Sequence, residues 1–339
     1  MPNANAGGYY RFALDEAGWL ALMDNFGALS EREALAVADS LTAAYEAGRV
    51  STPTLMSAYR ELTRSPYRNV IMAPSSKLKR IRDDLADDET KPAVEAFMRE
   101  IYQPRLASIG TDPGDNESAD RALLRGALVT FLAMEAKDPA LRTMLTGQAS
   151  AYIRMDEDTN ELDASAINPS FTATALNVAV QDLGVPFAEV LFERILASDD
   201  ARFREQASAA LAHATNPSLA EWVREKAFDD RLKGREPTNL IFGLAANPKE
   251  RRATFNWFQE NSQAFMDIVP VFAHRFLPNI GSGFCTLEER AEVEAVFGKV
   301  VEQAPAAARA NREALEKIEL CTALADAKRA EIAEYFSAI

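Results

Sequence analysis

The feature that most constrains the fold of this sequence is the helical spacing of its apolar residues, which continues from Trp19 to the end of the chain. Ser30 with Glu33 three residues later has the pattern of a capping box, which begins a helix. Pro53 follows Thr52 at a position typical of a first helical turn. Beyond these starts, the periodicity predicts helices over residues 77–85, 92–106, 119–134, 219–228, 251–258, 286–301 and 306–336.

Asn-Pro and Asp-Pro pairs punctuate the second half of the chain, and each combines a capping side chain with a proline suited to the first helical position. The four pairs are Asp138-Pro139, Asn168-Pro169, Asn216-Pro217 and Asn247-Pro248. The last two introduce similar helices around Trp222 and Trp257, about one α-solenoid repeat apart. The pattern predicts an all-α fold, an α-α superhelix of antiparallel helix pairs of the HEAT or armadillo type.

One segment reads as a strand. Tyr9–Leu14 follows the pair Gly7-Gly8 and ends at an acidic break that contains Gly18. A single strand cannot form a stable sheet alone, so we expect a short orphan strand left from a preceding domain. The predicted domains are therefore 1–15, a remnant of a preceding domain, which the resemblance described below implies to be a β-sandwich, and 16–339, the helical superhelical domain.

The charge balance argues against polyanionic partners. The chain has 51 acidic and 37 basic side chains, a formal net charge of −14. This charge opposes contact with nucleic acid and anionic membrane surfaces. No apolar run is long enough for a membrane span and the first residues lack a signal-peptide pattern, so we expect a soluble chain without an export signal of its own. Cytoplasmic and exported locations both stay open.

No self-contained catalytic site is evident. His213 and His274 are far apart, and neither belongs to an H-E-x-x-H pair. The nucleophile elbow and the phosphate-binding glycine loops are missing, and Gly281-Ser282-Gly283 is interpreted as a turn between helices. The acidic runs 83–89 and 156–163 lack the spacing of a calcium loop. We therefore predict no catalytic residue, metal ligand or cofactor in this chain.

The two cysteines, Cys285 and Cys321, pair or remain free, and their number alone does not decide the compartment. The apolar neighbours Phe284 and Leu320 favour buried, unreactive thiols. No C-x-x-C spacing is present, so a redox function is not supported. An aromatic stripe, Phe255, Trp257, Phe258, Phe265 and Phe272, is interpreted as core.

Three segments carry a family resemblance: residues 5–12 with the following Trp19-Leu20, the run 281–286, and the run 314–321. In this order they resemble the C-terminal part of zinc aminopeptidases of the aminopeptidase N type, in the puromycin-sensitive and endoplasmic-reticulum aminopeptidase branch. In that family a G-x-x-G-Y-Y-R strand ends a β-sandwich and leads into a helical domain. The zinc motif and the G-A-M-E-N segment of the family are missing here, so no catalytic or zinc residue is transferred to this sequence.

The resemblance implies a domain that shapes and covers the substrate chamber of an enzyme that removes N-terminal residues from peptides. Zinc would belong to the upstream catalytic domain, which is the expected partner together with a peptide substrate. The expected substrate-contact residues are His274, Arg275, Asn279 and Ser282. The alternative is a freestanding α-solenoid adaptor that binds a peptide or a protein.

Overall fold

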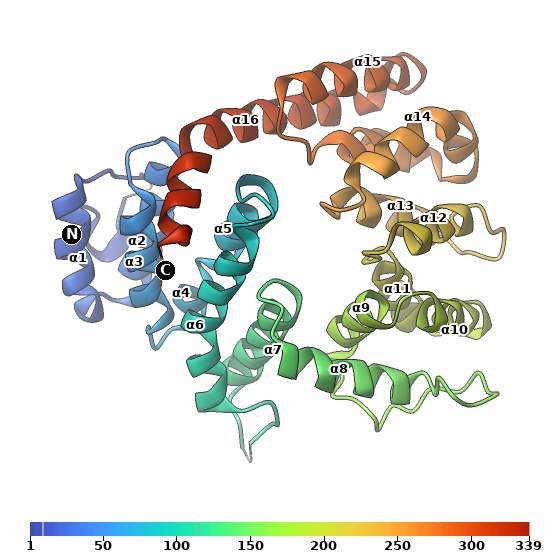
Figure 1. Cartoon of the computed structure of the whole chain (residues 1–339), viewed down its shortest axis with the longest axis horizontal. Coiled ribbons are helices and arrows are strands. Elements are labelled where there is room, and N and C mark those ends of the chain that lie inside the picture. The colour runs from blue at the N-terminus through green and yellow to red at the C-terminus, as the bar shows by residue number, and fades with distance from the viewer. Residues whose placement is uncertain (9, 115, 339) are drawn as a thin grey trace. The chain divides into compact units, whose positions relative to one another are not determined.

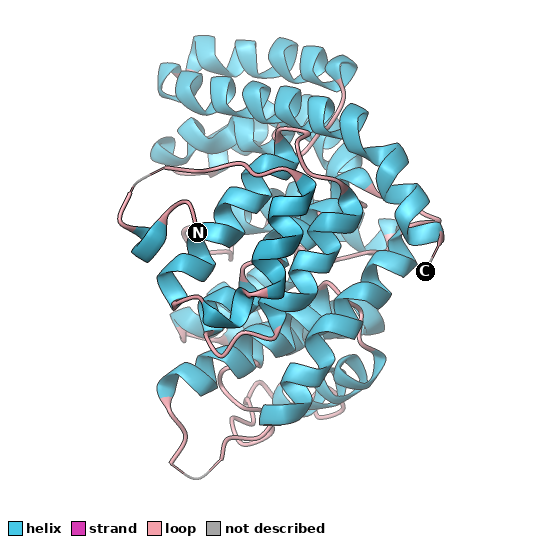
Figure 2. Ribbon diagram, turned by 90° about the vertical axis from the view of Figure 1, so that its left-hand side faces the viewer, coloured by secondary structure: helices cyan, strands magenta, loops and turns pink. Residues whose placement is uncertain are grey.

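The computed structural model describes residues 1–8, 10–114 and 116–338, and these contain helices and loops but no strand (Figure 2). The chain divides into two compact units. Unit 1 comprises Met1–Asp138 and Ala323–Ile339, and unit 2 comprises Pro139–Thr322. The predicted all-α class is confirmed. None of the described helices is both long and apolar enough to cross a membrane.

Unit 1 is built from short and medium helices. They are η1 (Ala4–Ala6), α1 (Glu16–Asp24), η2 (Phe26–Ala28), α2 (Glu31–Glu46), α3 (Thr52–Thr63), α4 (Arg68–Met72), α5 (Ser75–Arg80), η3 (Ile81–Leu85), α6 (Lys91–Ile109), α7 (Ala119–Met134) and the last turns of α16 (Ala308–Ser337). The predicted capping box is confirmed at the start of α2, where Ser30 and Glu33 bond each other's backbone.

The core of unit 1 is aromatic, and its largest fully buried side chains are Trp19, Tyr45, Tyr59, Phe97 and Tyr102. The end of α16 closes this core. Lys328 donates to the carbonyl of Val50 at 2.8 Å, and Glu331 accepts from the backbone N–H of Thr52 at 2.5 Å. The end of α16 therefore anchors the start of α3, although the two segments are far apart in sequence.

The predicted N-terminal strand is not formed. Tyr9 lies outside the described residues, and Tyr10–Leu14 is an extended segment without a strand partner among the residues that the structure describes. Its contacts go to helices: the backbone N–H of Phe12 donates to Ser40 at 3.3 Å, and the Phe12 ring stacks on Trp19 with centroids 5.6 Å apart. Among the described residues, this segment therefore packs on α1 and α2 and pairs with no strand.

Unit 2 is a succession of helices (Figure 1). They are α8 (Pro139–Tyr152), α9 (Thr172–Leu183), α10 (Val185–Ala197), α11 (Ala201–Leu211), α12 (Pro217–Lys226), α13 (Glu236–Ala246), α14 (Arg251–Ile268), η4 (Val271–Gly281), α15 (Leu287–Gln303), η5 (Pro305–Ala307) and the first part of α16. Helices α9, α11 and α13 contact one another in turn, α10 packs on α9 and α11, and α12 packs on α13. Alternate helices thus form one layer, with the intervening helices packed against it.

The Asn-Pro and Asp-Pro pairs have two outcomes. Pro139 and Pro217 begin α8 and α12, and the Asn216 side chain accepts from the N–H of Ser218, as predicted. The pairs at Asn168 and Asn247 instead form turns, and α9 and α14 begin several residues later. The predicted helix starts at these two pairs are wrong because an Asn side chain bonded two residues ahead satisfies a turn as well as a helix.

Buried arginines connect neighbouring helices of unit 2. Arg204 of α11 and Glu236 of α13 form a bidentate pair at 2.6 Å, with side chains only 4% and 7% exposed. Arg204 also donates to the carbonyls of Ile195 and Ser198 at the end of α10. One guanidinium therefore joins three helices.

Cys285 and Cys321 form a disulfide, so the expectation of two free thiols is wrong. Both residues are buried, as expected. Cys285 lies two residues before α15, and Cys321 lies within α16. The tertiary packing of these helices places the Cα atoms 5.0 Å apart, although 36 residues separate them in sequence. That proximity has no signature in the spacing of two cysteines.

Opening the disulfide should destabilise the chain. Because it closes a 36-residue loop, chain entropy predicts a loss of roughly 4 kcal/mol at most, and about 2–4 kcal/mol is expected for Cys285→Ser with Cys321→Ser. Urea unfolding of the oxidised wild type and of the double variant measures this difference. A reductant should destabilise the wild type and leave the variant unchanged. Two titratable thiols in the untreated native chain would contradict the assignment.

Removing one partner of the Arg204–Glu236 pair should cost more than removing both. Arg204→Met leaves a buried carboxylate without its cation, and we expect a loss of about 3–5 kcal/mol in the free energy of unfolding. Arg204→Met with Glu236→Leu should recover part of that loss. Denaturant unfolding of both variants provides the measurement, with Arg309→Met as a control because Arg309 pairs with Glu313 on the surface. Additive losses in the double variant would show that the pair is not coupled.

Candidate functional site

The four predicted substrate-contact residues lie together in unit 2. His274, Arg275 and Asn279 belong to the 3-10 helical segment η4, and Ser282 directly follows it. This segment packs against α13, α14 and α15 through Ala273, Leu277, Pro278, Ile280 and Gly281, which are buried. The four residues, which are neighbours in sequence, therefore lie on a segment that the helices around it support.

His274 is half-buried and is held by the backbone. Its Nε2 lies 2.9 Å from the carbonyl oxygen of Met266 at the end of α14. Because a carbonyl only accepts hydrogen bonds, Nε2 carries the proton in this contact. The atom left for a further partner is therefore Nδ1, which accepts when the ring is neutral.

The other three residues differ in what they offer. Arg275 is exposed, and its guanidinium lies over the ring of Phe276 at 4.5 Å, an arrangement that leaves N–H groups at its edge. Asn279 is exposed as well. The hydroxyl of Ser282 donates to the carbonyl of Asn279 at 2.9 Å, so it retains only its acceptor capacity. Arg275 and Asn279 are the available donors of the segment.

Exposed apolar side chains lie close in sequence to these polar groups. Ile268, Val271, Phe272 and Phe276 are 44%, 82%, 52% and 40% exposed, and we call this set the η4 apolar face. Such exposure of large apolar side chains in succession is typical of surfaces that contact a partner or ligand. Arg235 lies 6.0 Å from the ring centroid of Phe272, so this aromatic ring also has a cation beside it.

Sequence reasoning assigned Phe272 to the core with the rest of its aromatic stripe. Phe255, Phe258 and Phe265 are fully buried, which confirms that interpretation for them. Trp257 is only half-buried, and Phe272 is exposed. The signal that distinguishes it is Pro270, which follows the end of α14 and stops the helical register. A stripe extrapolated through that proline assigns Phe272 to the wrong face.

The turn after η4 is rigidly built. A Cβ on Gly281 would lie 2.7 Å from a methyl carbon of Val293 in α15, so only glycine fits this approach. Glu289 of α15 accepts from the backbone N–H of Cys285 at 3.1 Å and from the hydroxyl of Thr286 at 2.9 Å. Burial alone would raise the pKa of Glu289, but these bonds and Arg252 lower it below its usual value. The anionic Glu289 therefore holds Cys285 and Thr286 in place at the start of α15.

The described residues do not provide a metal centre. No group of three or more His, Cys, Asp or Glu side chains in that part of the chain is placed to hold an ion. A zinc site therefore does not fit the side chains that the structure describes. The side chains of η4 are suited to binding a ligand, through contact with its apolar groups and through hydrogen bonds from Arg275 and Asn279 to its acceptors.

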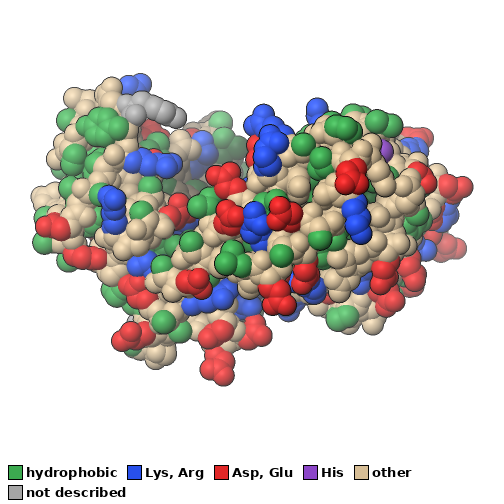
Figure 3. All heavy atoms as spheres, turned by 90° about the horizontal axis from the view of Figure 1, so that it is seen from above, with side chains coloured by type: hydrophobic (Ala, Val, Ile, Leu, Met, Phe, Trp, Pro, Cys, Tyr) green, Lys and Arg blue, Asp and Glu red, His purple; other side chains and the backbone are tan. Residues whose placement is uncertain are grey.

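The surface charge is mixed. The face seen in Figure 3 carries acidic and basic side chains interspersed, with hydrophobic side chains between them. The excess of acidic residues is therefore not gathered there into one continuous patch. Recognition on this face would depend on local groups more than on a field of one sign.

Comparison with known proteins relates this chain to a family of domains. The family model described as "ERAP1-like C-terminal domain" matches residues 1–320. Aminopeptidase M1 from Arabidopsis thaliana is 25% identical over 337 residues, which cover 94% of this chain and 36% of the relative. Aminopeptidase M1-C from Oryza sativa subsp. japonica is 22% identical over 332 residues, with 93% and 36% covered.

The chain thus spans about a third of the length of the curated relatives that it matches. The family model, in contrast, covers nearly all of the chain, including η4 and its turn. The chain belongs to the family of ERAP1-like C-terminal domains.

Proposed function

We propose that this chain is the C-terminal domain of a zinc-dependent aminopeptidase that releases N-terminal amino acids from peptides. The observation that carries the proposal is the family match over residues 1–320. Two relatives named as aminopeptidases support it, and each is nearly three times as long as the part it shares with this chain. Zinc and the catalytic residues would belong to an upstream catalytic domain, the proposed partner of this one.

The proposed role of the domain is to shape and cover the substrate chamber. The contacts between alternate helices in unit 2 support a stack of helix pairs, and a continued stack of this kind makes an α-α superhelix. A curved helical wall can enclose a peptide end and exclude folded proteins. The proposed domain division has residues 1–15 as a remnant of a preceding β-sandwich domain and 16–339 as the helical superhelical domain.

Within that wall we propose η4 as a substrate contact. The η4 apolar face would accept peptide side chains, and Arg275 and Asn279 would donate to peptide carbonyls. His274 would contribute Nδ1 and Ser282 would contribute its hydroxyl oxygen as an acceptor. The Nε2–H of His274 and the hydroxyl proton of Ser282 are already donated to backbone carbonyls. Each role is binding, so the segment would influence KM more than the chemical step.

The isolated chain should not hydrolyse aminoacyl substrates, with or without added zinc. The same chain joined to the catalytic region of its parent protein should do so in a chelator-sensitive manner. A panel of fluorogenic aminoacyl substrates, read together with metal content, provides the measurement. Stoichiometric zinc and chelator-sensitive cleavage by the isolated chain would overturn the proposal, and full activity of the catalytic region without this chain would favour the adaptor alternative.

Arg275→Ala should weaken peptide binding in the joined protein. Loss of one charged donor costs a factor of about ten in KM for peptides, with little change in kcat. Steady-state kinetics with a peptide and with a single-residue fluorogenic substrate separate the two effects, because the short substrate does not extend to η4. Arg309→Ala is the matched control, since its side chain is 83% exposed and pairs on the surface. Equal kinetics of the two variants would remove Arg275 from the site.

A further inference from the structure

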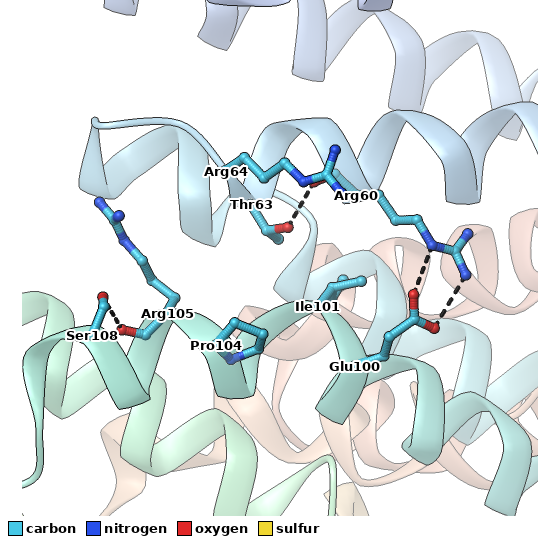
Figure 4. A pocket seen from close by; sticks show the side chains of 8 residues that line it. All are labelled: Arg60, Thr63, Arg64, Glu100, Ile101, Pro104, Arg105 and Ser108. Carbon is cyan, nitrogen blue, oxygen red and sulfur yellow. Dashed lines mark hydrogen bonds and ion pairs between the residues drawn. The ribbon is translucent and has the colours of Figure 1, made fainter.

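Unit 1 contains a pocket of about 420 Å³ between α3 and α6. It is lined by Arg60, Thr63, Arg64, Glu100, Ile101, Pro104, Arg105 and Ser108. Figure 4 shows Arg60, Thr63 and Arg64 on the α3 side and the other five residues on α6. Its volume lies within the range of small-molecule sites.

The ionisable side chains that line the pocket are three arginines and one glutamate, in a chain whose net charge is −14. Glu100 is engaged with Arg60 in a bidentate pair at 2.9 and 3.2 Å, and this hydrogen bonding raises the pKa of Arg60. Arg60 also donates to the hydroxyl of Tyr335 at 3.1 Å. Because Glu100 compensates Arg60, no lining carboxylate compensates the positive charges of Arg64 and Arg105.

Arg64 and Arg105 are weakly compensated. Arg64 pairs with Glu61 at 2.6 Å, but the two side chains are 71% and 36% exposed, so water screens the attraction. The Nε of Arg105 is buried and has no hydrogen-bond partner among the described residues. Because this Nε is enclosed by protein atoms, a ligand in the pocket would meet the terminal N–H groups of the Arg105 guanidinium.

The neutral side chains that line the pocket offer a ligand no free hydroxyl donor. The hydroxyl of Thr63 donates to the carbonyl of Arg60 at 3.0 Å, and that of Ser108 donates to the carbonyl of Arg105 at 2.7 Å. Both hydroxyl protons are therefore committed to the backbone. Pro104 has no N–H to offer. The donors available to a ligand are the guanidinium groups of Arg64 and Arg105, one from each wall.

We propose that this pocket binds a small molecule through a carboxylate or phosphate group. Planar guanidinium forks match the oxygens of these two groups, and the terminal N–H groups of Arg64 and Arg105 can donate charge-assisted bonds to them. Ile101 and Pro104 supply an apolar wall for the rest of the ligand. The site lies wholly within unit 1 and is independent of the aminopeptidase proposal.

Calorimetric titration of the 339-residue chain with inorganic phosphate and with citrate, at one ionic strength, tests the site. We expect the wild type to bind both anions, and the lower Kd assigns phosphate or carboxylate as the preferred group. Arg105→Gln should raise that Kd by about tenfold to a hundredfold, because it removes a charged donor from the pocket wall. Arg309→Gln, a surface change outside the pocket, should leave the Kd unchanged.

Glu100→Gln should change the affinity for anions in the opposite direction. It removes the only carboxylate of the lining and releases the charge of Arg60, so anion binding should tighten. A purely structural role of the pocket would not produce weakening in one variant and tightening in the other. Circular dichroism establishes that each variant is folded, and Arg64→Gln replaces Arg105→Gln if that variant does not fold. The proposal is wrong if neither anion binds in the millimolar range, or if the arginine variant and Arg309→Gln bind equally well.

Discussion

The interaction on which the rest of unit 2 depends is the bonding of buried arginines to the ends of helices. A helix end leaves carbonyls without intrahelical partners, and these are costly to bury. Arg194 donates to the carbonyls of Ile153, Arg154 and Glu157 after α8, and Arg204 does the same at the end of α10. Helices of modest length can therefore end inside the structure without leaving polar groups unsatisfied.

The same bonds specify how the helices meet. A buried ion pair contributes little net stability, because desolvation offsets its attraction, but a wrong partner leaves an uncompensated charge. Arg224 of α12 faces Glu250 before α14, with side chains 9% and 3% exposed, just as Arg204 faces Glu236. Apolar layers alone would tolerate a shifted packing, whereas a shift would separate the charges of these arginine–glutamate pairs. Specific positioning of η4 follows, since α13 and α14 form its support.

Local chemistry was sufficient to predict most helices but not what the helices bring together. The Ser30 capping box and the start at Pro217 depend on neighbours within a few residues, and both are confirmed. The Cys285–Cys321 disulfide and the pocket of Arg60 and Arg105 join residues distant in sequence, so no spacing rule detects them. Tyr10–Leu14 resembled a strand by composition, yet α1 and α2 supply its partners. The substrate contacts predicted for His274, Arg275, Asn279 and Ser282 stay a prediction. The exposure of Phe272 was missed because Pro270 breaks the helical register.

The net charge of this chain and the local charge of the pocket affect an anionic ligand at different distances. A net charge of −14 repels anions at distances up to about a Debye length, roughly 8 Å at physiological salt. Inside a pocket, the nearest groups dominate, since the effective dielectric constant is lower there than in water. Arg64 and Arg105 would therefore hold an anion that the protein as a whole does not attract. Added salt weakens the long-range repulsion more than the contact with the partly buried Arg105, so affinity at such a site should fall less steeply with ionic strength than at an exposed basic patch.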